Sequence, residues 1–224
     1  MRKKGKTEAE KAVEVIPSVN ASDFAEIKKR IKKVEPYAKW AHLDVSDGVF
    51  TKHVSWHEPK DLVGFKPKLK LEVHLMIDKP EESIAEWLIK PSVWRVIFHQ
   101  EATQNHRLLI DKIHESGKEA GLAIRPETPW LKLFPYLDKA DLFLLLAVSP
   151  GPSGQEFNEL VLEKIGHIRH VAKNAIIEID GGVTKAVARR CIAEGANLLV
   201  AGSYLFNAKS IKKAIEELKK PDEI

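Results

Sequence analysis

The sequence is poor in sulfur and contains no long apolar run. Cys191 is the only cysteine among 224 residues, which excludes an intramolecular disulfide framework and favours a reducing compartment, so we expect a cytoplasmic location. No apolar run approaches the roughly 20 residues that a membrane-spanning helix requires, and the N-terminal segment lacks the apolar core of a secretory signal. We therefore expect no membrane partner.

The sequence also has little net charge once its N-terminal segment is set aside. Residues 1–11 hold five basic and two acidic side chains, so they carry +3 of the formal net charge of +4. A nucleic-acid-binding protein would need basic residues clustered on a folded face, and we expect no nucleic-acid partner. We predict that residues 1–11 form a frayed, solvated leader and that residues 12–224 form the folded domain.

The remaining composition is that of a globular protein, with 44% hydrophobic and 30% charged residues. Apolar runs alternate with amphipathic stretches, which is typical of a parallel sheet covered by helices. Eight such runs can be distinguished, which leaves about 28 residues for each strand–helix unit of a single-domain (β/α)₈ barrel. The predicted strands are Val13–Val19, Trp40–Val45, Leu69–Ile77, Val93–Phe98, Ala120–Ile124, Leu142–Val148, Ala175–Ile179 and Leu198–Ala201.

Helical patterns and end signals fall between these runs. Ser22 or Asp23 can cap the first helix, Pro80 suits a first helical position, and Gly117 and Gly195 suit helix ends. Shorter or proline-interrupted segments at 57–65 and 129–137 are weaker helix predictions. The stronger ones are 21–34, 80–89, 105–116, 158–172, 184–194 and 208–220.

Polar side chains stand where several predicted strands end, which is where the active groups of such barrels lie. His42 and Asp44 are two residues apart on one strand, so their side chains share a face. If that face is the inside of the barrel, His74 and Asp180 converge on them from other strands. Two imidazoles and two carboxylates suit Zn²⁺ or another divalent transition metal. The alternative is that each histidine is a hydrogen-bonded core residue.

Two glycine-containing turns suit an anion. Gly181 and Gly182 precede a helix that is predicted to begin near Thr184, and Gly202–Ser203 follows the last strand. The loops after the seventh and eighth strands of these barrels often bind phosphate through backbone N–H groups. The alternative is that the glycines only form turns.

With these residues in place, the sequence resembles the ribulose-phosphate 3-epimerase family over about residues 13–208. The resemblance lies in eight motifs in order, IPSVNASDF, HLDVSDGVF, EVHLMID, HQEAT, RPETP, VSPGPSGQEF, IEIDGGV and LLVAGSYLF. It implies a (β/α)₈ barrel that binds one divalent metal ion (Zn, Fe, Mn or Co) and inverts C3 of a pentulose 5-phosphate. It also implies a homo-oligomer whose substrate is a ketose phosphate.

The resemblance further implies roles for individual residues. Asp44 and Asp180 match the two acid/base residues, which move a proton through an enediolate, although the sequence leaves open which one acts first. The matching metal ligands are His42, Asp44, His74 and Asp180. The matching substrate-binding residues are Ser18, His74, Met76, Gly154, Gly181, Gly182, Gly202 and Ser203.

The sequence departs from the family motifs around the expected site. Ser46 and Leu146 replace methionines, Pro152–Ser153 alters the loop after the sixth strand, and Arg125 stands before PETP. Arg125 either points into the barrel mouth or pairs with Glu127. Glu101 either supports the metal site or is a loop charge. Two alternatives therefore stay open: an epimerase of a hexulose 6-phosphate such as allulose 6-phosphate, and a phosphate-binding barrel without catalysis.

Overall fold

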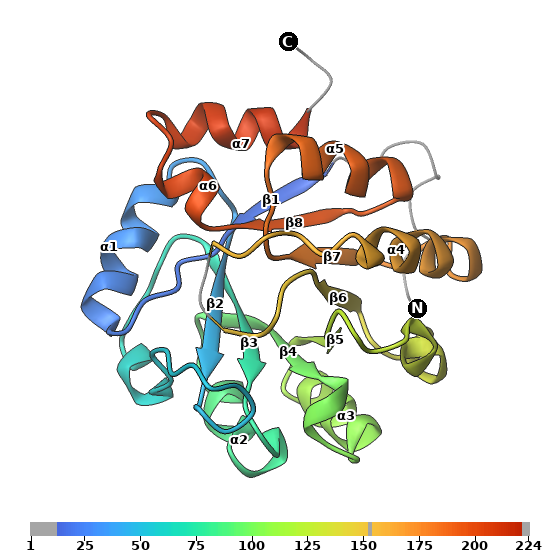
Figure 1. The fold of residues 1–224 in the computed structure, drawn as a ribbon. Helices are drawn as coiled ribbons and strands as arrows, with labels where there is room; N and C mark the ends of the chain where they lie inside the picture. Colours follow the sequence, from blue (N-terminus) through green and yellow to red (C-terminus); the bar gives the residue numbers. More distant parts are fainter. Residues whose placement is uncertain (1–12, 152–153, 221–224) are drawn as a thin grey trace.

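A computed structural model describes residues 13–151 and 154–220 and contains a barrel of eight parallel strands surrounded by helices (Figure 1). The strands pair in the order β1-β8-β7-β6-β5-β4-β3-β2. The ring closes where the Val19 amide donates to the His42 carbonyl at 2.9 Å. The predicted (β/α)₈ fold is confirmed. The strands are β1 Glu14–Pro17, β2 Trp40–Ser46, β3 Lys70–Met76, β4 Val93–His99, β5 Glu119–Ile124, β6 Leu142–Leu146, β7 Ile177–Asp180 and β8 Leu198–Ala201.

The helices pack around the outside of the barrel (Figure 1). The α-helices are α1 Phe24–Val34, α2 Ile84–Leu88, α3 His106–Glu115, α4 Leu160–Val171, α5 Lys185–Glu194, α6 Ser203–Phe206 and α7 Ile211–Lys219. The 3₁₀ segments are η1 Pro59–Leu62, η2 Pro80–Glu82, η3 Gln100–Ala102 and η4 Trp130–Tyr136. The leader predicted for residues 1–11 lies outside the described residues, and so do Pro152–Ser153.

The helix predictions were wrong in detail where proline or a tight turn interrupts the pattern. The segment predicted at 80–89 divides into η2 and α2, and η2 follows Lys79, which has a positive φ of 45°. Segments 57–65 and 129–137 contain 3₁₀ turns, the second with Pro135 inside it. The segment predicted at 208–220 begins later, and α6 precedes it.

Two hydrophobic clusters hold the barrel together. The larger one lies between the strands and the outer helices. The smaller one lies inside the barrel and draws most of its residues from β6 and β8. It consists of Ile16, Trp40, Ile97, Ala123, Leu142, Leu144, Leu146, Leu198 and Val200. The rest of the inward face is polar. It carries six side chains that are fully or almost fully buried, namely His42, Glu72, His74, Arg95, His99 and Glu178. This polar half of the interior leads up to the candidate site.

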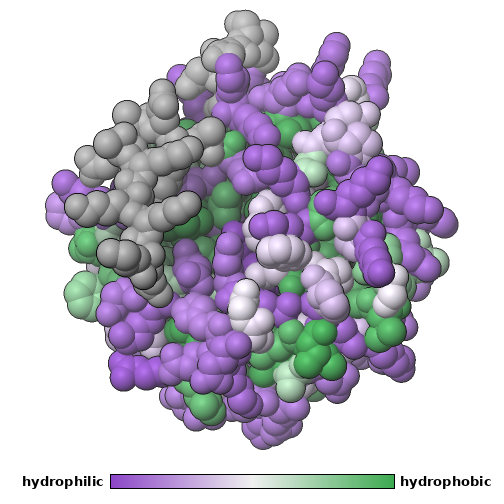
Figure 2. All heavy atoms as spheres, turned by 180° about the vertical axis from the view of Figure 1, so that it is seen from behind, coloured by the Kyte–Doolittle hydropathy of each residue, from purple (hydrophilic) through white to green (hydrophobic). Residues whose placement is uncertain are grey.

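The outer surface is mainly hydrophilic on the face opposite to that of Figure 1, and its hydrophobic side chains form separate patches (Figure 2). Among the described residues, no helix combines the length and apolarity needed to cross a membrane.

Candidate metal and substrate site

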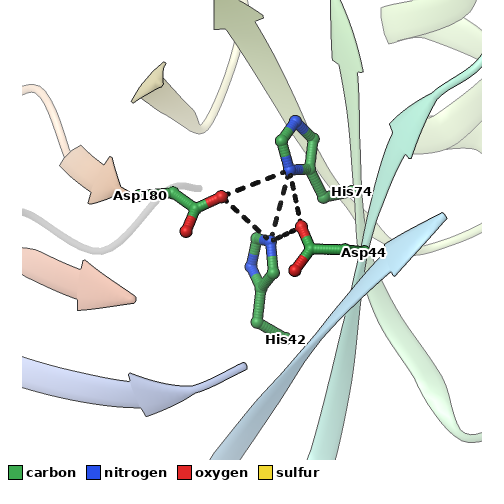
Figure 3. A group of neighbouring side chains, drawn as sticks. All are labelled: His42, Asp44, His74 and Asp180. Atoms are coloured by element: carbon green, nitrogen blue, oxygen red, sulfur yellow. Dashed lines mark hydrogen bonds and ion pairs between the residues drawn. The ribbon is translucent and has the colours of Figure 1, made fainter. Parts of the chain in front are cut away.

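Four side chains from three strands converge at the mouth of the barrel (Figure 3). His42 and Asp44 lie on β2, His74 lies on the neighbouring β3, and Asp180 ends β7 on the other side of the site. In the parallel register Asp44 pairs with His74, so alternation brings both side chains to the same level inside the barrel. Both imidazoles are fully buried, whereas the Asp44 and Asp180 side chains are 10% and 14% exposed.

The separations of the facing atoms fit a single bound ion. His42 Nε2 lies 3.1 Å from Asp44 Oδ1, 3.3 Å from His74 Nδ1 and 3.8 Å from Asp180 Oδ2. His74 Nδ1 lies 3.2 Å from the same Asp44 oxygen and 3.7 Å from the same Asp180 oxygen. Ligands held at about 2.0–2.2 Å around one ion lie roughly 2.9–4.3 Å apart. The cluster could therefore hold a divalent metal ion without rearrangement.

Each imidazole has a second partner that directs its other ring nitrogen away from the cluster. His42 Nδ1 lies 2.7 Å from Glu72 Oε1, and a carboxylate there requires the proton on Nδ1. This leaves Nε2 of a neutral His42 as an acceptor facing the cluster. His74 Nε2 lies 2.8 Å from His99 Nε2. Partners of this kind are typical of metal-binding histidines, because they fix the tautomer and the ring orientation.

Charges inside the cluster shift the pKa values in opposite directions. Burial lowers the pKa of His42, but the Asp44 charge and hydrogen bonds to carboxylates outweigh burial and raise it well above 6.5. The pKa of His74 is raised as well, because hydrogen bonds to Asp180 and Asp44 outweigh its burial. Burial acts to raise the pKa of Asp44, yet the two imidazoles lower it below its usual value. The lowered pKa keeps Asp44 ionised at neutral pH, and the raised pKa values of the two histidines mean that a metal ion would compete with protons for their ring nitrogens.

Glu101 belongs to this network and is not an isolated loop charge. Its Oε2 lies 3.1 Å from His99 Nδ1, and its Oε1 accepts the Arg125 amide at 2.9 Å and the Thr128 hydroxyl. Although burial opposes ionisation, these hydrogen bonds lower the pKa of Glu101 to about 2. Burial lowers the pKa of His99 to about 4, so His99 is neutral behind His74.

Arg125 does not form the ion pair with Glu127 that the sequence left open, and its guanidinium packs against the loop after β2. Its Nη2 donates to the Phe50 carbonyl at 2.8 Å, and its guanidinium carbon lies 4.0 Å from the centre of the Phe50 ring. The Phe50 ring in turn lies 4.8 Å from that of His99. Arg125 therefore fixes the loop that follows β2 above the barrel.

A pocket next to the four-residue cluster contains most of the other predicted residues. Asp44 and Asp180 line it, whereas His42 and His74 lie beneath it. The structure brings together around this pocket all the predicted substrate-binding residues except His74, namely Ser18, Met76, Gly154, Gly181, Gly182, Gly202 and Ser203. The pocket is thus bounded by the two carboxylates on one side and by glycine-containing loops on the other.

The backbone of the paired glycines requires the absence of a side chain. Gly182 has a φ of 65°, and a Cβ there would lie 2.8 Å from the Phe157 amide nitrogen. Gly181 has a φ of 106°, and its Cβ would lie 2.6 Å from a Val148 methyl group. Thr184 then caps α5 by accepting the Val187 amide. Only glycine allows the chain to turn so closely between β7 and α5.

The chain is similar to known proteins over nearly its whole length. The model of the ribulose-phosphate 3 epimerase family matches residues 14–206. The chain belongs to the ribulose-phosphate 3-epimerase family. Among its curated relatives, ribulose-phosphate 3-epimerase of Bacillus subtilis (strain 168) is 38% identical over 215 residues, covering 92% of this chain and 98% of the relative. The chloroplastic ribulose-5-phosphate-3-epimerase of Arabidopsis thaliana is 37% identical, covering 92% and 75%. The expectation of an isomerase is confirmed.

Solved structures support the fold of the epimerase-family chain. KGPDC from Streptococcus mutans has a TM-score of 0.70 at 11% identity and covers 94% of this chain and 97% of its own. 3-Hexulose-6-phosphate synthase from Salmonella typhimurium has a TM-score of 0.67 at 12% identity, covering 93% and 98%. At such identities the likeness concerns the barrel alone. The curated relatives do not favour the hexulose-phosphate or the non-catalytic alternative.

Two departures from the family motifs occupy different surroundings. Leu146 is buried and lines the pocket, as Met76 does. Ser46 has the same inward register as His42 and Asp44, is fully buried, and its hydroxyl has no hydrogen-bond partner among the described residues. The first departure keeps an apolar wall, whereas the second introduces a polar atom above Asp44.

Three charged residues inside the barrel were not among the residues predicted from the sequence. Glu72, Arg95 and Glu178 all lie on the inward face beneath the four-residue cluster. Burial and the Glu72 charge raise the pKa of Glu178 to about 7. For Glu72 and Glu178 a signal was present in the spacing, because each precedes a predicted site residue, His74 or Asp180, by two positions and so shares a face of its strand with it.

Proposed function

We propose that this protein interconverts ribulose 5-phosphate and xylulose 5-phosphate by moving the proton at C3. The observation that carries the proposal is the convergence of His42, Asp44, His74 and Asp180 beside a pocket bounded by glycine loops. Family membership and the names of the curated relatives support the substrate pair. The same loops make a phosphorylated ketose a better fit than an unphosphorylated sugar, because backbone N–H groups suit an anion.

The two carboxylates act as the acid/base pair. Asp44 and Asp180 approach from β2 and β7, so a substrate carbon between them would have one carboxylate on each face (Figure 3). One carboxylate removes the C3 proton and the other protonates the opposite face, which inverts the centre without turning the substrate over. Ser18 Oγ donates to Asp44 Oδ2 at 2.9 Å and orients this carboxylate.

A divalent ion would be held by His42 Nε2, Asp44 Oδ1, His74 Nδ1 and Asp180 Oδ2. When bound, the ion supplies positive charge beside the oxygens that become negative as the enediolate forms. Imidazole and carboxylate ligands accept Zn²⁺, Fe²⁺, Mn²⁺ or Co²⁺. Gly154, Gly181, Gly182, Gly202 and Ser203 bind the phosphate, so that C3 is fixed relative to the aspartates. We also propose a homo-oligomer, in keeping with the family resemblance.

Hydrogen exchange at C3 tests the function directly. Ribulose 5-phosphate is incubated in D₂O with the protein and each of the four metal ions, and the loss of the C3 proton is followed by NMR. We expect exchange together with formation of xylulose 5-phosphate. Asp44→Asn and Asp180→Asn should each reduce the rate by at least about 10²-fold, since each removes one acid/base group. Absence of exchange with every ion would contradict the function.

The control for these variants is Asp111→Asn, which changes an exposed aspartate on α3. It carries the same loss of charge and should retain the exchange rate. If Asp44→Asn and Asp180→Asn also retain it, the acid/base assignment is wrong even though the activity is right. Allulose 6-phosphate in the same assay shows whether the substrate is the pentulose phosphate.

A further inference from the structure

A buried arginine lies at the base of the polar half of the barrel. Arg95 is on β4, points inward and is 7% exposed. Its Nη1 lies 2.5 Å from Glu72 Oε2 and 3.6 Å from Glu178 Oε2, and its Nε and Nη2 donate to Glu119 Oε2 at 2.8 and 2.6 Å. Its guanidinium carbon lies 4.3 Å from the centre of the Trp40 ring. Contacts with four other strands therefore fix one rotamer of this side chain.

Glu72 connects this arginine to the metal-binding cluster. One of its oxygens, Oε2, accepts from Arg95, and the other, Oε1, lies 2.7 Å from His42 Nδ1. Because both oxygens are engaged, the carboxylate cannot rotate without breaking a charge-assisted hydrogen bond. The orientation of the His42 ring thus depends on the position of Glu72, which depends in turn on Arg95.

The buried charges around His42 also point to a role for Arg95. Glu72 and Glu178 are both fully buried and both approach His42 Nδ1, at 2.7 and 3.5 Å. Two carboxylates in so small a volume need a compensating charge, because burial of unpaired charge is strongly unfavourable. Within residues 13–151 and 154–220, Arg95 is the only lysine or arginine that forms an ion pair with either of them.

We propose that Arg95 is a positioning residue for the metal site: it holds Glu72 against His42 Nδ1, so that His42 presents Nε2 to the ion. Arg95 lies beneath the ligands and contacts neither the pocket nor the four converging atoms. The inference rests on the proposed function in one respect, which is that His42 binds the metal. Outer partners of metal-bound histidines typically change metal affinity by about 10–100-fold when they are removed.

Metal binding to the full chain tests this role. Mn²⁺ affinity is measured by calorimetry on protein freed of metal, for the wild type, Arg95→Met and Arg95→Lys. We expect Arg95→Met to weaken Mn²⁺ binding at least about tenfold, and Arg95→Lys to recover part of the loss, because lysine restores the charge but not the two-pronged geometry. With Co²⁺, the visible absorption bands of Arg95→Met should shift, which reports the altered histidine ligand. Wild-type affinity in a folded Arg95→Met would overturn the proposal.

The matched control is Arg169→Met, which removes a structural arginine far from the cluster. Arg169 donates to the Gly195 carbonyl and to Asn197 Oδ1, each at 2.7 Å. This variant should lower the melting temperature while keeping the Mn²⁺ affinity within about twofold of wild type. A tenfold loss in the control as well would mean that any destabilisation weakens metal binding, and the specific role of Arg95 would be wrong.

A double variant covers the case in which Arg95→Met does not fold. Glu72→Gln removes one buried charge and keeps an oxygen that can accept from His42, so Arg95→Met with Glu72→Gln leaves fewer unpaired charges. If Arg95 acts through Glu72, the double variant binds Mn²⁺ as Glu72→Gln does. A further tenfold loss in the double variant would overturn that route. If wild-type protein binds none of the divalent ions, the proposed function fails by itself.

Discussion

At the scale of single residues, the chemistry of the site depends on the partners that its side chains have outside the cluster. His42 and His74 each place one ring nitrogen in the cluster and the other against a buried partner, Glu72 or His99. The four cluster residues could be predicted from the sequence, because they stand at strand ends in motifs of known spacing. The sequence did not predict roles for Glu72, Arg95 and Glu178, because the partners of a charged residue within an apolar strand are known only once the barrel has closed around it.

The raised pKa of His42 gives a prediction for metal binding. Its imidazole must be neutral at Nε2 to bind an ion, and Asp44 favours the protonated form, so protons compete with the metal over a range that extends above pH 6.5. Asp44 adds no competition there, because its own pKa is lowered. Mn²⁺ affinity should therefore fall as the pH is lowered from 8 to 6, by up to about tenfold per pH unit for each proton released.

Calorimetry in two buffers of different ionisation enthalpy measures both the affinity and the number of protons released. The control is Asp111→Asn, which removes an exposed carboxylate on α3 that has no contact with the cluster. This variant should keep the slope of affinity against pH. An affinity independent of pH in the wild type would show that His42 is neutral throughout this range.

At the scale of elements, the bounds of the strands agree closely with the prediction from the sequence, whereas the segments between the strands differ from it. β2 and β4 begin at the predicted residues, Trp40 and Val93, because continuous apolar runs suit strands that are buried on both faces. The segment after Lys79 could not be predicted as a 3₁₀ turn followed by a short helix, because periodicity does not reveal a positive φ in a residue other than glycine. Proline explains the 3₁₀ form of η4, since Pro135 lacks the N–H that an α-helix would use.

The start of α1 gives a prediction at this scale. The sequence left Ser22 and Asp23 as alternative caps, and the structure selects Asp23, whose Oδ1 accepts the Glu26 amide at 2.9 Å. Asp23→Ala should cost about 1 kcal/mol of stability, which corresponds to roughly 2–4 °C in the melting temperature of a protein of this size. Ser22→Ala serves as the control and should change stability by less than about 0.5 kcal/mol. Thermal unfolding followed by circular dichroism measures both, and a reversed order would contradict this assignment of the cap.

At the scale of the whole molecule, the inside of the barrel is divided into an apolar and a polar half. The apolar half, to which β6 and β8 contribute most, gives packing without any need for ion pairs. The polar half depends on the hydrogen bonds of Glu72 and on the charge of Arg95, which pairs with both Glu72 and Glu178. The division could not be predicted from the sequence, because strands far apart in the chain contribute to it, as β3 does with Glu72 and β7 with Glu178, about 100 residues later. A metal ion bound at the cluster should thus stabilise the half of the barrel that hydrophobic packing stabilises least.

Cys191 provides a probe of that stabilisation in the outer layer of the barrel. The thiol is on α5, is fully buried within the outer hydrophobic cluster, and burial raises its pKa to about 12. Alkylation by iodoacetamide therefore requires unfolding that exposes α5. Mn²⁺ that binds the folded chain alone adds about 2.7 kcal/mol to the free energy of unfolding at 100 times its dissociation constant. Under conditions in which exposure precedes alkylation in rapid equilibrium, labelling should slow by about 100-fold.

The rate of Cys191 alkylation is followed by mass spectrometry, with and without Mn²⁺. His42→Ala serves as the matched control, because it keeps Cys191 and its surroundings but removes a predicted ligand, so added Mn²⁺ should leave its labelling rate nearly unchanged. Equal rates in the wild type with and without a saturating ion would mean that α5 detaches while the metal cluster stays intact. The barrel would then open in parts, because an ion that binds the open and closed forms equally cannot shift the equilibrium between them.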